Sequence, residues 1–181
     1  MLLRALQSVN NQTVEPAITY IVSHRTPYGM TPVEHLAWQM NQMLGNIETP
    51  WMMRLADDDW LEPDHIEKMW DMIIETLSFF TLYYSYEKDR HIPRVDSSNF
   101  EPEDLHSLLL EKNWIDGSGT VVKVNSLIGV GGFKTQIKPF EDWDTWLAMS
   151  HYSNFRTCCV PYETWHAGRG NYERIGGIHV S

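Results

Sequence analysis

Three consecutive aspartates, Asp57, Asp58 and Asp59, follow the apolar run WMMRLA at residues 51–56. Neighbouring carboxylates destabilise each other's ionised forms, so all three stay charged only if water or a cation lies among them. Carboxylate oxygens are the ligands that Mg²⁺ and Mn²⁺ prefer, and the position of these acids at the end of a predicted strand favours a metal site. The structural alternative is that they cap the helix predicted to open at Pro63.

A second acidic group, Glu141, Asp142 and Asp144, precedes a predicted helix that carries tryptophan and leucine. A carboxyl group held among aromatic side chains such as Trp143 has a raised pKa and is able to accept a proton from a hydroxyl nucleophile. Capping of the helix by the same acids is the alternative, and the residues alone do not separate the two interpretations.

His166 lies at the end of a predicted strand, within the stretch YETWHAGRGNYER. A histidine at this place completes a metal site or contacts a phosphate, and Arg169 among glycines suits a pyrophosphate. A structural role is the alternative, and it is the commoner one for an isolated histidine. The stretch GSGTVV at 117–122 predicts a tight turn, and exposure of the Gly119 backbone to a substrate is the second interpretation.

Apolar spacing predicts that helices and strands alternate along the chain. Thr31, Pro32 and Glu34 form a helix-start signature ahead of an apolar stripe that ends at Leu44. Further helices are predicted at 2–9, from Pro63 to Leu77, at 102–113 and at 142–152, and strands at 17–22, 51–56, 78–87, 119–125 and 155–165. This order predicts an α/β fold with helices on both faces of a sheet, in which ligands collect at the carboxyl ends of strands.

The length of 181 residues predicts one domain with its own core. The formal net charge of −10 argues against an extended nucleic-acid partner, because such binding depends on Lys and Arg. No apolar run reaches the roughly 20 residues of a transmembrane helix, and the first residues lack the features of a signal peptide. Adjacent Cys158 and Cys159 are expected to be core thiols in a reducing cytoplasm.

Several stretches, in this order along the chain, resemble a family-2 glycosyltransferase with the GT-A fold. LLRALQSVNNQT resembles the family's first helix, and NQMLGNIETPWMMRLADDDWLEPDHIEKM resembles the segment with the DXD motif. GSGTVVKVNSLIGVGGFKTQIKPFEDWDTWLAM resembles the acceptor-side strand, the Gly-Gly-Phe turn and the Glu-Asp pair, and YETWHAGRGN resembles the closing stretch. The resemblance covers almost the whole chain and implies a mixed, mostly parallel sheet.

The resemblance also implies roles for individual residues. Asp57 and Asp59 would hold Mn²⁺ or Mg²⁺ on the diphosphate of a nucleotide-sugar donor, with His166 near the metal. Asp142 would deprotonate the hydroxyl of an acceptor that the sequence does not identify, and the attack would invert the anomeric centre. The other substrate contacts are expected from Asp58, Glu141, Trp143, Arg169 and Gly119.

The chain begins at the helix that follows the family's usual first strand, and Ser23 and His24 stand where the family often has paired aspartates. We therefore expect one glycosyltransferase-like domain over residues 1–181. Its donor and metal half, 1–60, would lack the first strand, and 61–181 would be the acceptor half. A second chain is one source of the absent strand.

Two other functions are left open. A non-catalytic nucleotide-sugar or glycan-binding domain is consistent with the absent strand and with Trp114, Trp143 and Trp165, which we expect to be exposed and to stack on sugar rings. A metal-dependent phosphohydrolase would use both acidic groups instead.

Overall fold

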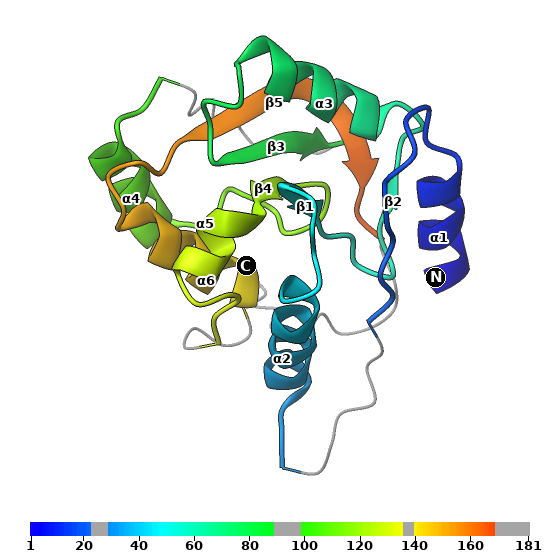
Figure 1. Cartoon of the computed structure of the whole chain (residues 1–181), viewed down its shortest axis with the longest axis horizontal. Helices are drawn as coiled ribbons and strands as arrows, with labels where there is room; N and C mark the ends of the chain where they lie inside the picture. Colours follow the sequence, from blue (N-terminus) through cyan, green and yellow to red (C-terminus); the bar gives the residue numbers. More distant parts are fainter. Residues whose placement is uncertain (23–28, 89–98, 136–139, 169–181) are drawn as a thin grey trace, which may run out of the picture.

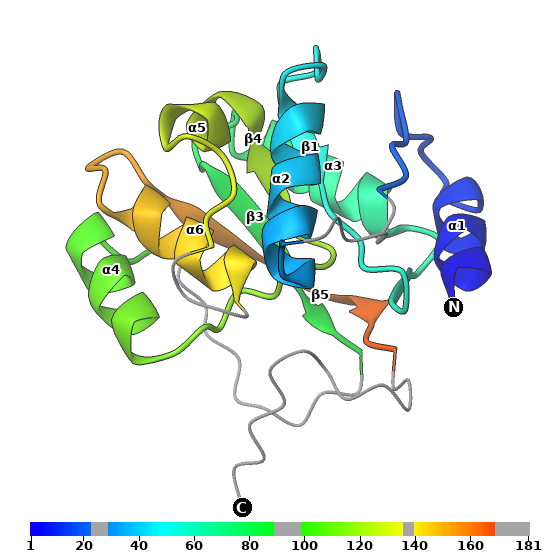
Figure 2. The same cartoon turned by 90° about the horizontal axis from the view of Figure 1, so that it is seen from below.

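The computed structural model describes residues 1–22, 29–88, 99–135 and 140–168. The helices are α1 (Leu2–Asn10), α2 (Pro32–Leu44), α3 (His65–Glu75), α4 (Pro102–Glu111), α5 (Val124–Gly129) and α6 (Glu141–Ser150). The strands are β1 (Trp51–Met53), β2 (Trp60–Leu61), β3 (Leu82–Glu87), β4 (Val121–Lys123) and β5 (Thr157–His166). The strands form a five-stranded sheet, with α3 on one face and α2, α5 and α6 on the other (Figure 1, Figure 2). The predicted α/β class with helices on both faces is confirmed.

The sheet is mostly antiparallel, and the prediction of a mostly parallel sheet is wrong. Its strand order is β1-β4-β3-β5-β2. The β3–β5 pair is parallel, whereas the pairs β1–β4, β4–β3 and β5–β2 are antiparallel. The physical reason is that β4 enters between β1 and β3 and runs opposite to both. Alternation of helices and strands along the sequence does not encode which strands become neighbours.

Alternate residues of the central strands face two separate cores. In β3, Leu82 and Tyr84 pack with residues of α2, α4 and α6, whereas Tyr83 packs with α3. In β5, Cys159 joins the first core and Cys158 the second, and both thiols are buried and outside any disulfide. Successive residues of a strand point to opposite faces, so each of these strands contributes to both cores. The prediction of two core thiols is confirmed.

The predicted start of α2 is confirmed in detail. The Thr31 hydroxyl accepts a hydrogen bond from the Glu34 backbone N–H, and the Glu34 carboxylate accepts one from the Thr31 backbone N–H. Pro32 lies in the first turn, where its missing N–H costs nothing. The helix buries its apolar stripe against the first core through Ala37, Met40 and Leu44.

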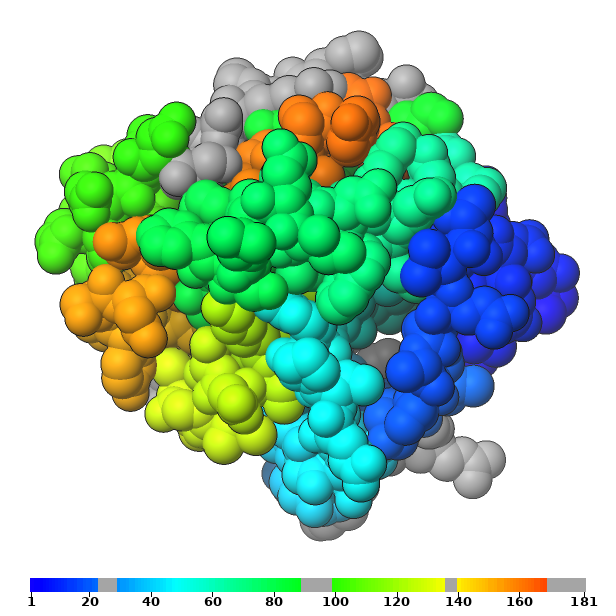
Figure 3. Space-filling model, turned by 45° about the horizontal axis from the view of Figure 1, so that its top comes forward, coloured from blue at the N-terminus to red at the C-terminus, as the bar shows by residue number. Residues whose placement is uncertain are grey.

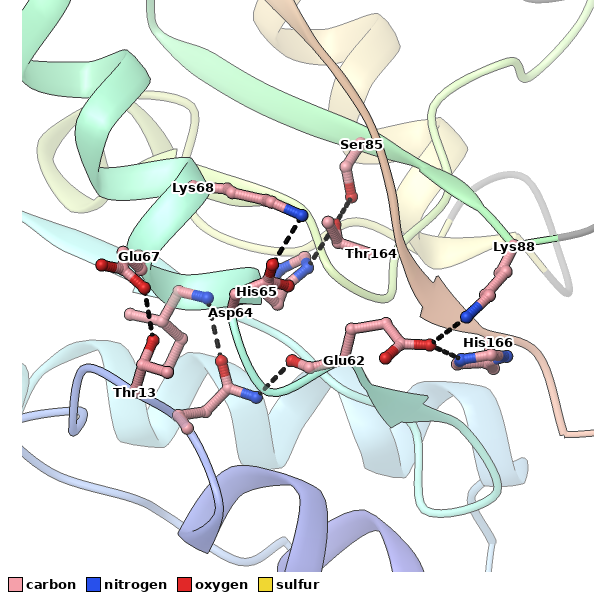
Figure 4. Close-up of polar contacts among 12 residues, drawn as sticks. Thr13, Glu62, Asp64, His65, Glu67, Lys68, Ser85, Lys88, Thr164 and His166 are labelled. Carbon is pink, nitrogen blue, oxygen red and sulfur yellow. Dashed lines mark hydrogen bonds and ion pairs between the residues drawn. The ribbon is translucent and has the colours of Figure 1, made fainter.

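The C-terminal end of α1 is joined to the start of α3. The Gln12 side-chain amide donates to the Glu62 carbonyl oxygen at 2.7 Å, and its amide oxygen accepts from the Ile66 N–H at 2.9 Å. The Thr13 hydroxyl donates to a Glu67 carboxylate oxygen at 2.7 Å. Figure 4 shows the Thr13–Glu67 contact on the N-terminal side of α3. These bonds fix α1 at one end of the molecule, beside β2.

Several of the predicted strands differ from the structure. The strands predicted at 51–56 and 78–87 are shorter, at Trp51–Met53 and Leu82–Glu87. Residues 17–22 form neither helix nor strand and are largely exposed. A strand needs a hydrogen-bonded neighbour, and the described sheet ends at β1 before it reaches them. The predicted strand at 119–125 is confirmed only for Val121–Lys123, because the chain turns from Lys123 directly into α5.

The apolar stripe of α3 is only partly covered. Met69 and Ile73 are buried as predicted, but Trp70 is 44% exposed and Ile74 55% exposed. No helix in the described part of the chain is long and apolar enough to cross a membrane.

Leu109 and Leu110 of α4 offer a matched test of the first core, because their exposures are 0% and 61%. We expect Leu109→Ala to lower the free energy of unfolding by about 2–5 kcal/mol, since it leaves a cavity among the packed side chains. Leu110→Ala should change it by less than about 0.5 kcal/mol. Chemical denaturation of both variants measures this, and equal losses would contradict the packing described.

Candidate active site

Asp59 is a buried carboxylate that links three segments of the chain. Its Oδ2 accepts a hydrogen bond of 2.5 Å from the Ser118 hydroxyl, and its Oδ1 accepts one of 2.8 Å from the Gly168 N–H. The Ser118 hydroxyl oxygen in turn accepts from the Ala56 N–H at 3.1 Å. Charge-assisted hydrogen bonds of this kind offset the cost of burying the charge. Asp59 therefore ties the turn after β1 to the 117–119 turn and to the end of β5.

The three aspartates lie at different depths. Asp57 is exposed, Asp58 is half-buried and Asp59 is buried. Gly168 packs so closely on the turn that a Cβ atom built on it would lie within van der Waals overlap of the Asp58 carbonyl oxygen. Any side chain at position 168 would force the end of β5 away from the aspartates.

Glu141 and Asp142 open α6 beside Arg54, which follows β1. Arg54 Nη1 lies 2.5 Å from Glu141 Oε1, and both side chains are largely buried. A Cβ atom built on Gly117 would lie 3.0 Å from Arg54 Nη1 and 3.0 Å from Asp142 Oδ2. Gly117 therefore packs directly against this group, and the absence of a side chain lets it do so.

The Asp142 carboxyl group holds its proton more tightly than an ordinary aspartate. Burial raises the pKa of Asp142 to about 6, and the negative charges of Glu141 and Asp116 act in the same direction. The Arg54 guanidinium and a hydrogen bond from the Trp143 N–H oppose that rise in the pKa. The prediction of an aspartate with a raised pKa at this place agrees with the structure.

The turn Gly117–Ser118–Gly119 connects the two acidic groups. Ser118 bonds Asp59, and Gly117 packs against Asp142. The Gly119 N–H donates to the Arg54 carbonyl oxygen at 3.1 Å, which holds the turn against the end of β1. Two clusters more than 80 positions apart in the sequence thus lie on either side of one tripeptide.

Gly119 has φ +69°, a left-handed conformation that favours glycine. A Cβ atom there would lie 3.1 Å from the imidazole of His65 and 3.1 Å from the Trp165 indole. The Gly119 conformation is therefore required for the turn to pack on β5 and α3, which agrees with the tight-turn interpretation.

His166 extends toward a group of charged and aromatic residues at the end of β5. Its Nε2 lies 2.6 Å from a Glu62 carboxylate oxygen, which also accepts from Lys88 Nζ at 2.7 Å (Figure 4). Hydrogen bonds from Lys88 and His166 lower the pKa of Glu62. The His166 ring stacks on Trp60 with centroids 4.7 Å apart, and the Arg4 guanidinium also lies over the Trp60 ring.

A buried polar chain lies beside this group. His65 Nδ1 is 2.8 Å from the Thr164 hydroxyl, which donates to the Ser85 hydroxyl oxygen at 2.8 Å (Figure 4). Burial lowers the pKa of His65 to about 4, so the imidazole is neutral at physiological pH. These hydrogen-bonded side chains join α3, β5 and β3 behind the Gly117–Gly119 turn.

In the described part of the chain, the predicted metal ligands do not form a complete metal-binding site. Among the described residues, no group of three or more His, Cys, Asp or Glu side chains is placed to hold an ion together. His166 contacts Glu62, and both Asp59 oxygens already accept hydrogen bonds. The hard oxygens of Asp57, Asp58 and Asp59 nevertheless fit a divalent cation that takes its other ligands from a diphosphate and water, as Mg²⁺ commonly does.

The expectation of exposed tryptophans is wrong. Trp165 is only 3% exposed, and its indole N–H donates to the Ser85 carbonyl oxygen. Trp143 is half-buried and donates to the Leu109 carbonyl oxygen at 2.6 Å, and Trp114 packs edge-on against Tyr84 in the first core. Trp114 and Trp143 thus pack against the first core, and such packing depends on residues that are distant in the sequence.

Sequence reasoning missed Arg54, Ser118 and Gly117, and Arg169 lies outside the described residues. Arg54 could have been recognised as a candidate, because it is the one charged residue within the apolar run 51–56. Ser118 lies between two glycines, where a small hydroxyl residue is common in any turn. Its role therefore depends on the spatial neighbour Asp59, which the sequence does not reveal.

The raised pKa of Asp142 predicts that stability depends on pH. A group whose pKa is higher in the folded state than its ordinary value of 3.8 destabilises the fold as pH rises from about 4 to about 6. Asp142→Asn, which stays neutral, should therefore unfold with a free energy about 1–3 kcal/mol higher at pH 8 and equal to the wild type below pH ~4. Denaturation from pH 3 to 8 measures the difference, with Asp71→Asn on the exposed face of α3 as control.

Removal of the Ser118 hydroxyl tests the Asp59 anchor. Ser118→Ala removes one hydrogen-bond donor from a buried carboxylate, so we expect a loss of about 1–3 kcal/mol in the free energy of unfolding. Ser107→Ala, on the exposed side of α4, should have an effect below about 0.5 kcal/mol. Equal effects in urea denaturation would show that the Ser118–Asp59 bond contributes no stability.

The search with protein-family models found no match, and the search of curated proteins found none either. Among solved structures, the chain is similar to S. aureus TarS, a glycosyltransferase. The structure of TarS 1-349 has a TM-score of 0.53 and 15% sequence identity, over 72% of this chain and 39% of that one. TarS 1-349 in complex with UDP-GlcNAc has a TM-score of 0.54 and 16% identity, over 78% of this chain and 41% of that one. The chain thus spans about two fifths of TarS 1-349 and shares a glycosyltransferase fold with it.

Proposed function

We propose that this chain is a metal-dependent, inverting glycosyltransferase of family 2, which moves a sugar from a nucleotide-sugar donor to an acceptor hydroxyl. One observation carries the proposal: Asp59 and Asp142, from two distant acidic groups, adjoin the same Gly117–Ser118–Gly119 turn. The shared fold supports it, because TarS 1-349 has been solved in complex with UDP and with UDP-GlcNAc.

The aspartate turn is the proposed donor side. Asp57 and Asp59 would hold Mn²⁺ or Mg²⁺, and the neighbouring Asp58 would contact the donor. A divalent cation at such a place supplies positive charge that stabilises the leaving nucleoside diphosphate. Hydrogen bonds from the Ser118 hydroxyl and the Gly168 N–H orient the Asp59 carboxylate.

Asp142 is the proposed base. At pH 7 and above a carboxyl group with a pKa of about 6 is mostly ionised, and it is a stronger base than an ordinary aspartate. The acceptor oxygen attacks the anomeric carbon and transfers its proton to Asp142. The bond between that carbon and the diphosphate oxygen breaks, and its electron pair leaves with the nucleoside diphosphate. One displacement of this kind inverts the anomeric centre.

The residues around Asp142 have proposed supporting roles. Glu141 is held by Arg54, so that pair keeps the start of α6 against the end of β1. Trp143 adds a half-buried aromatic surface beside the base. Arg169 is proposed as a phosphate ligand, and His166 as a residue that supports the donor from the end of β5.

The other parts of the proposal concern the chain as a whole. Residues 1–60 form the donor half and 61–181 the acceptor half, although Gly168 from the second contacts Asp59 of the first. The reduced state of the two cysteines is consistent with a cytoplasmic location, which belongs to the proposal.

The decisive experiment measures donor binding and sugar transfer separately. Calorimetry with UDP, with and without Mn²⁺, gives donor binding, and release of UDP from UDP-GlcNAc in the presence of a panel of hydroxyl acceptors gives transfer. Metal-dependent UDP binding without transfer would favour the non-catalytic binding domain. Release of free phosphate without a glycosylated product would favour the phosphohydrolase.

For the enzyme we expect Asp142→Asn to lower sugar transfer by about 10²–10⁴-fold, because it removes the base. Binding of UDP with Mn²⁺ should be unchanged, since Asp142 lies on the acceptor side. Asp71→Asn, on the outer surface of α3, should keep full activity. Intact transfer by Asp142→Asn would refute the assignment of this residue as the base.

A further inference from the structure

Two histidines meet where α4 packs against the C-terminal end of α6. His106 lies in the middle of α4, and His151 is the residue directly after α6. Their ring centroids are 4.4 Å apart, with an angle of 44° between the rings. In Figure 3 the green surface around α4 adjoins the orange surface of the segment that ends α6, at the left edge of the molecule. The pair lies outside the two acidic groups of the candidate site.

The first core holds these two histidines on a fixed frame. Leu105 and Leu109 of α4 pack with Met149 of α6, and all three side chains are buried. The indole N–H of Trp143, in the first turn of α6, donates to the Leu109 carbonyl oxygen at 2.6 Å. Neither helix is able to shift without disturbing close-packed side chains, so the core sets the backbone positions of both histidines.

The His106 ring has a defined tautomer. Its Nδ1 lies 2.8 Å from the Ser150 hydroxyl oxygen. That hydroxyl donates its single proton to the Leu147 carbonyl oxygen at 2.9 Å, so it accepts from His106, and the ring proton is on Nδ1. Burial and the nearby His151 lower the pKa of His106, so the ring is uncharged at neutral pH. The lone pair on Nε2 is therefore available to a metal ion.

The two rings are placed to share one ion. An imidazole whose other ring nitrogen is hydrogen-bonded is the usual form of a histidine metal ligand. A metal–nitrogen bond is about 2.0–2.1 Å long, so a single ion reaches both rings when their centroids are 4.4 Å apart. His151 is exposed, and rotation of its side chain brings a nitrogen to the ion without a change in the core.

The charges near the pair are compatible with a bound cation. His151 follows the last turn of α6, where the carbonyl oxygens carry a partial negative charge. Arg156 is the next basic residue along the chain, and its guanidinium lies 3.4 Å from a Glu101 carboxylate oxygen, which balances its charge. On α4, Glu103 lies one turn before the histidine, and Lys112 lies beyond the end of the helix.

We propose that His106 and His151 bind one divalent late transition-metal ion, such as Ni²⁺, Cu²⁺ or Zn²⁺, at the contact of α4 with α6. Imidazole nitrogens suit these ions, whereas Mg²⁺ and Mn²⁺ prefer oxygen ligands. The described residues contain no group of three or more ligating His, Cys, Asp or Glu side chains, so water takes the other positions on the ion. The proposal does not depend on the glycosyltransferase function, because His151 lies at the opposite end of α6 from Asp142.

Calorimetry of the full chain with Ni²⁺, in the presence of excess Mg²⁺, measures the binding. The Mg²⁺ competes for carboxylate sites but not for imidazole. We expect saturable binding of Ni²⁺ by the wild type, and binding at this pair about tenfold weaker or worse in His151→Ala. Tyr152→Ala alters the next exposed residue and keeps both rings, so it should bind Ni²⁺ as the wild type does.

A second variant tests the orientation of His106. Ser150→Ala removes the hydroxyl that accepts from Nδ1, and loss of such a partner weakens metal affinity about 10–100-fold. Ser107→Ala, at an exposed position of the same helix α4, is the control and should leave the affinity unchanged. Because the ion links α4 to α6, Ni²⁺ should also raise the Tm of the wild type and of Ser107→Ala, but not that of His151→Ala.

The paramagnetism of Ni²⁺ locates the site in the unaltered chain, where no variant has to fold. Substoichiometric Ni²⁺ should broaden the ring proton signals of His106 and His151 before those of the other histidines. Broadening that begins at another histidine overturns the proposal. Equal Ni²⁺ affinity of the wild type and His151→Ala does so too, as does the absence of saturable binding. Unchanged affinity in Ser150→Ala would contradict the ligand role of His106.

Discussion

The arrangement of the candidate site depends on one buried charge. Asp59 accepts hydrogen bonds from Ser118 and from the Gly168 backbone, so the turn after β1, the 117–119 turn and the end of β5 share a single anchor. Loss of these donors from a buried carboxylate is costly, so the hydrogen bonds favour the close approach of the three segments. The Asp142 group depends on the same anchor, because Gly117 packs against it next to Ser118.

The local structure of the chain could be predicted well, whereas the order of its strands could not. The capping box of Thr31 and Glu34 and the helix that follows are encoded within a few residues, and the structure contains them. Whether the strands of the sheet are parallel or antiparallel depends on β4, which comes late in the sequence and lies between β1 and β3. The segment 17–22 has strand composition but no strand beside it, and pairing is a property of two segments.

In the candidate site, too, features that depend on sequence neighbours could be predicted, whereas those that depend on distant residues could not. The acidic residue types followed from the sequence, and so did a raised pKa for one carboxylate of the group Glu141, Asp142 and Asp144, but the identity of that carboxylate depends on burial, which the structure gives to Asp142. Arg54 and Ser118 could not be assigned, since each acts through a partner more than 50 positions away. The tryptophans were misjudged for a related reason: a ring's exposure is decided by what packs on it, as Trp165 shows.

The adjacent cysteines of β5 have a consequence for how the protein's motions are observed. Cys158 and Cys159 occupy opposite sides of one strand, so each reports on a different layer of packed side chains. A thiol reagent reaches Cys158 only when α3 lifts from the sheet, and Cys159 only when the layer of α2, α4 and α6 loosens. Their separate alkylation rates would therefore measure how often each of the two layers opens. Both rates come from the same molecule and from adjacent residues.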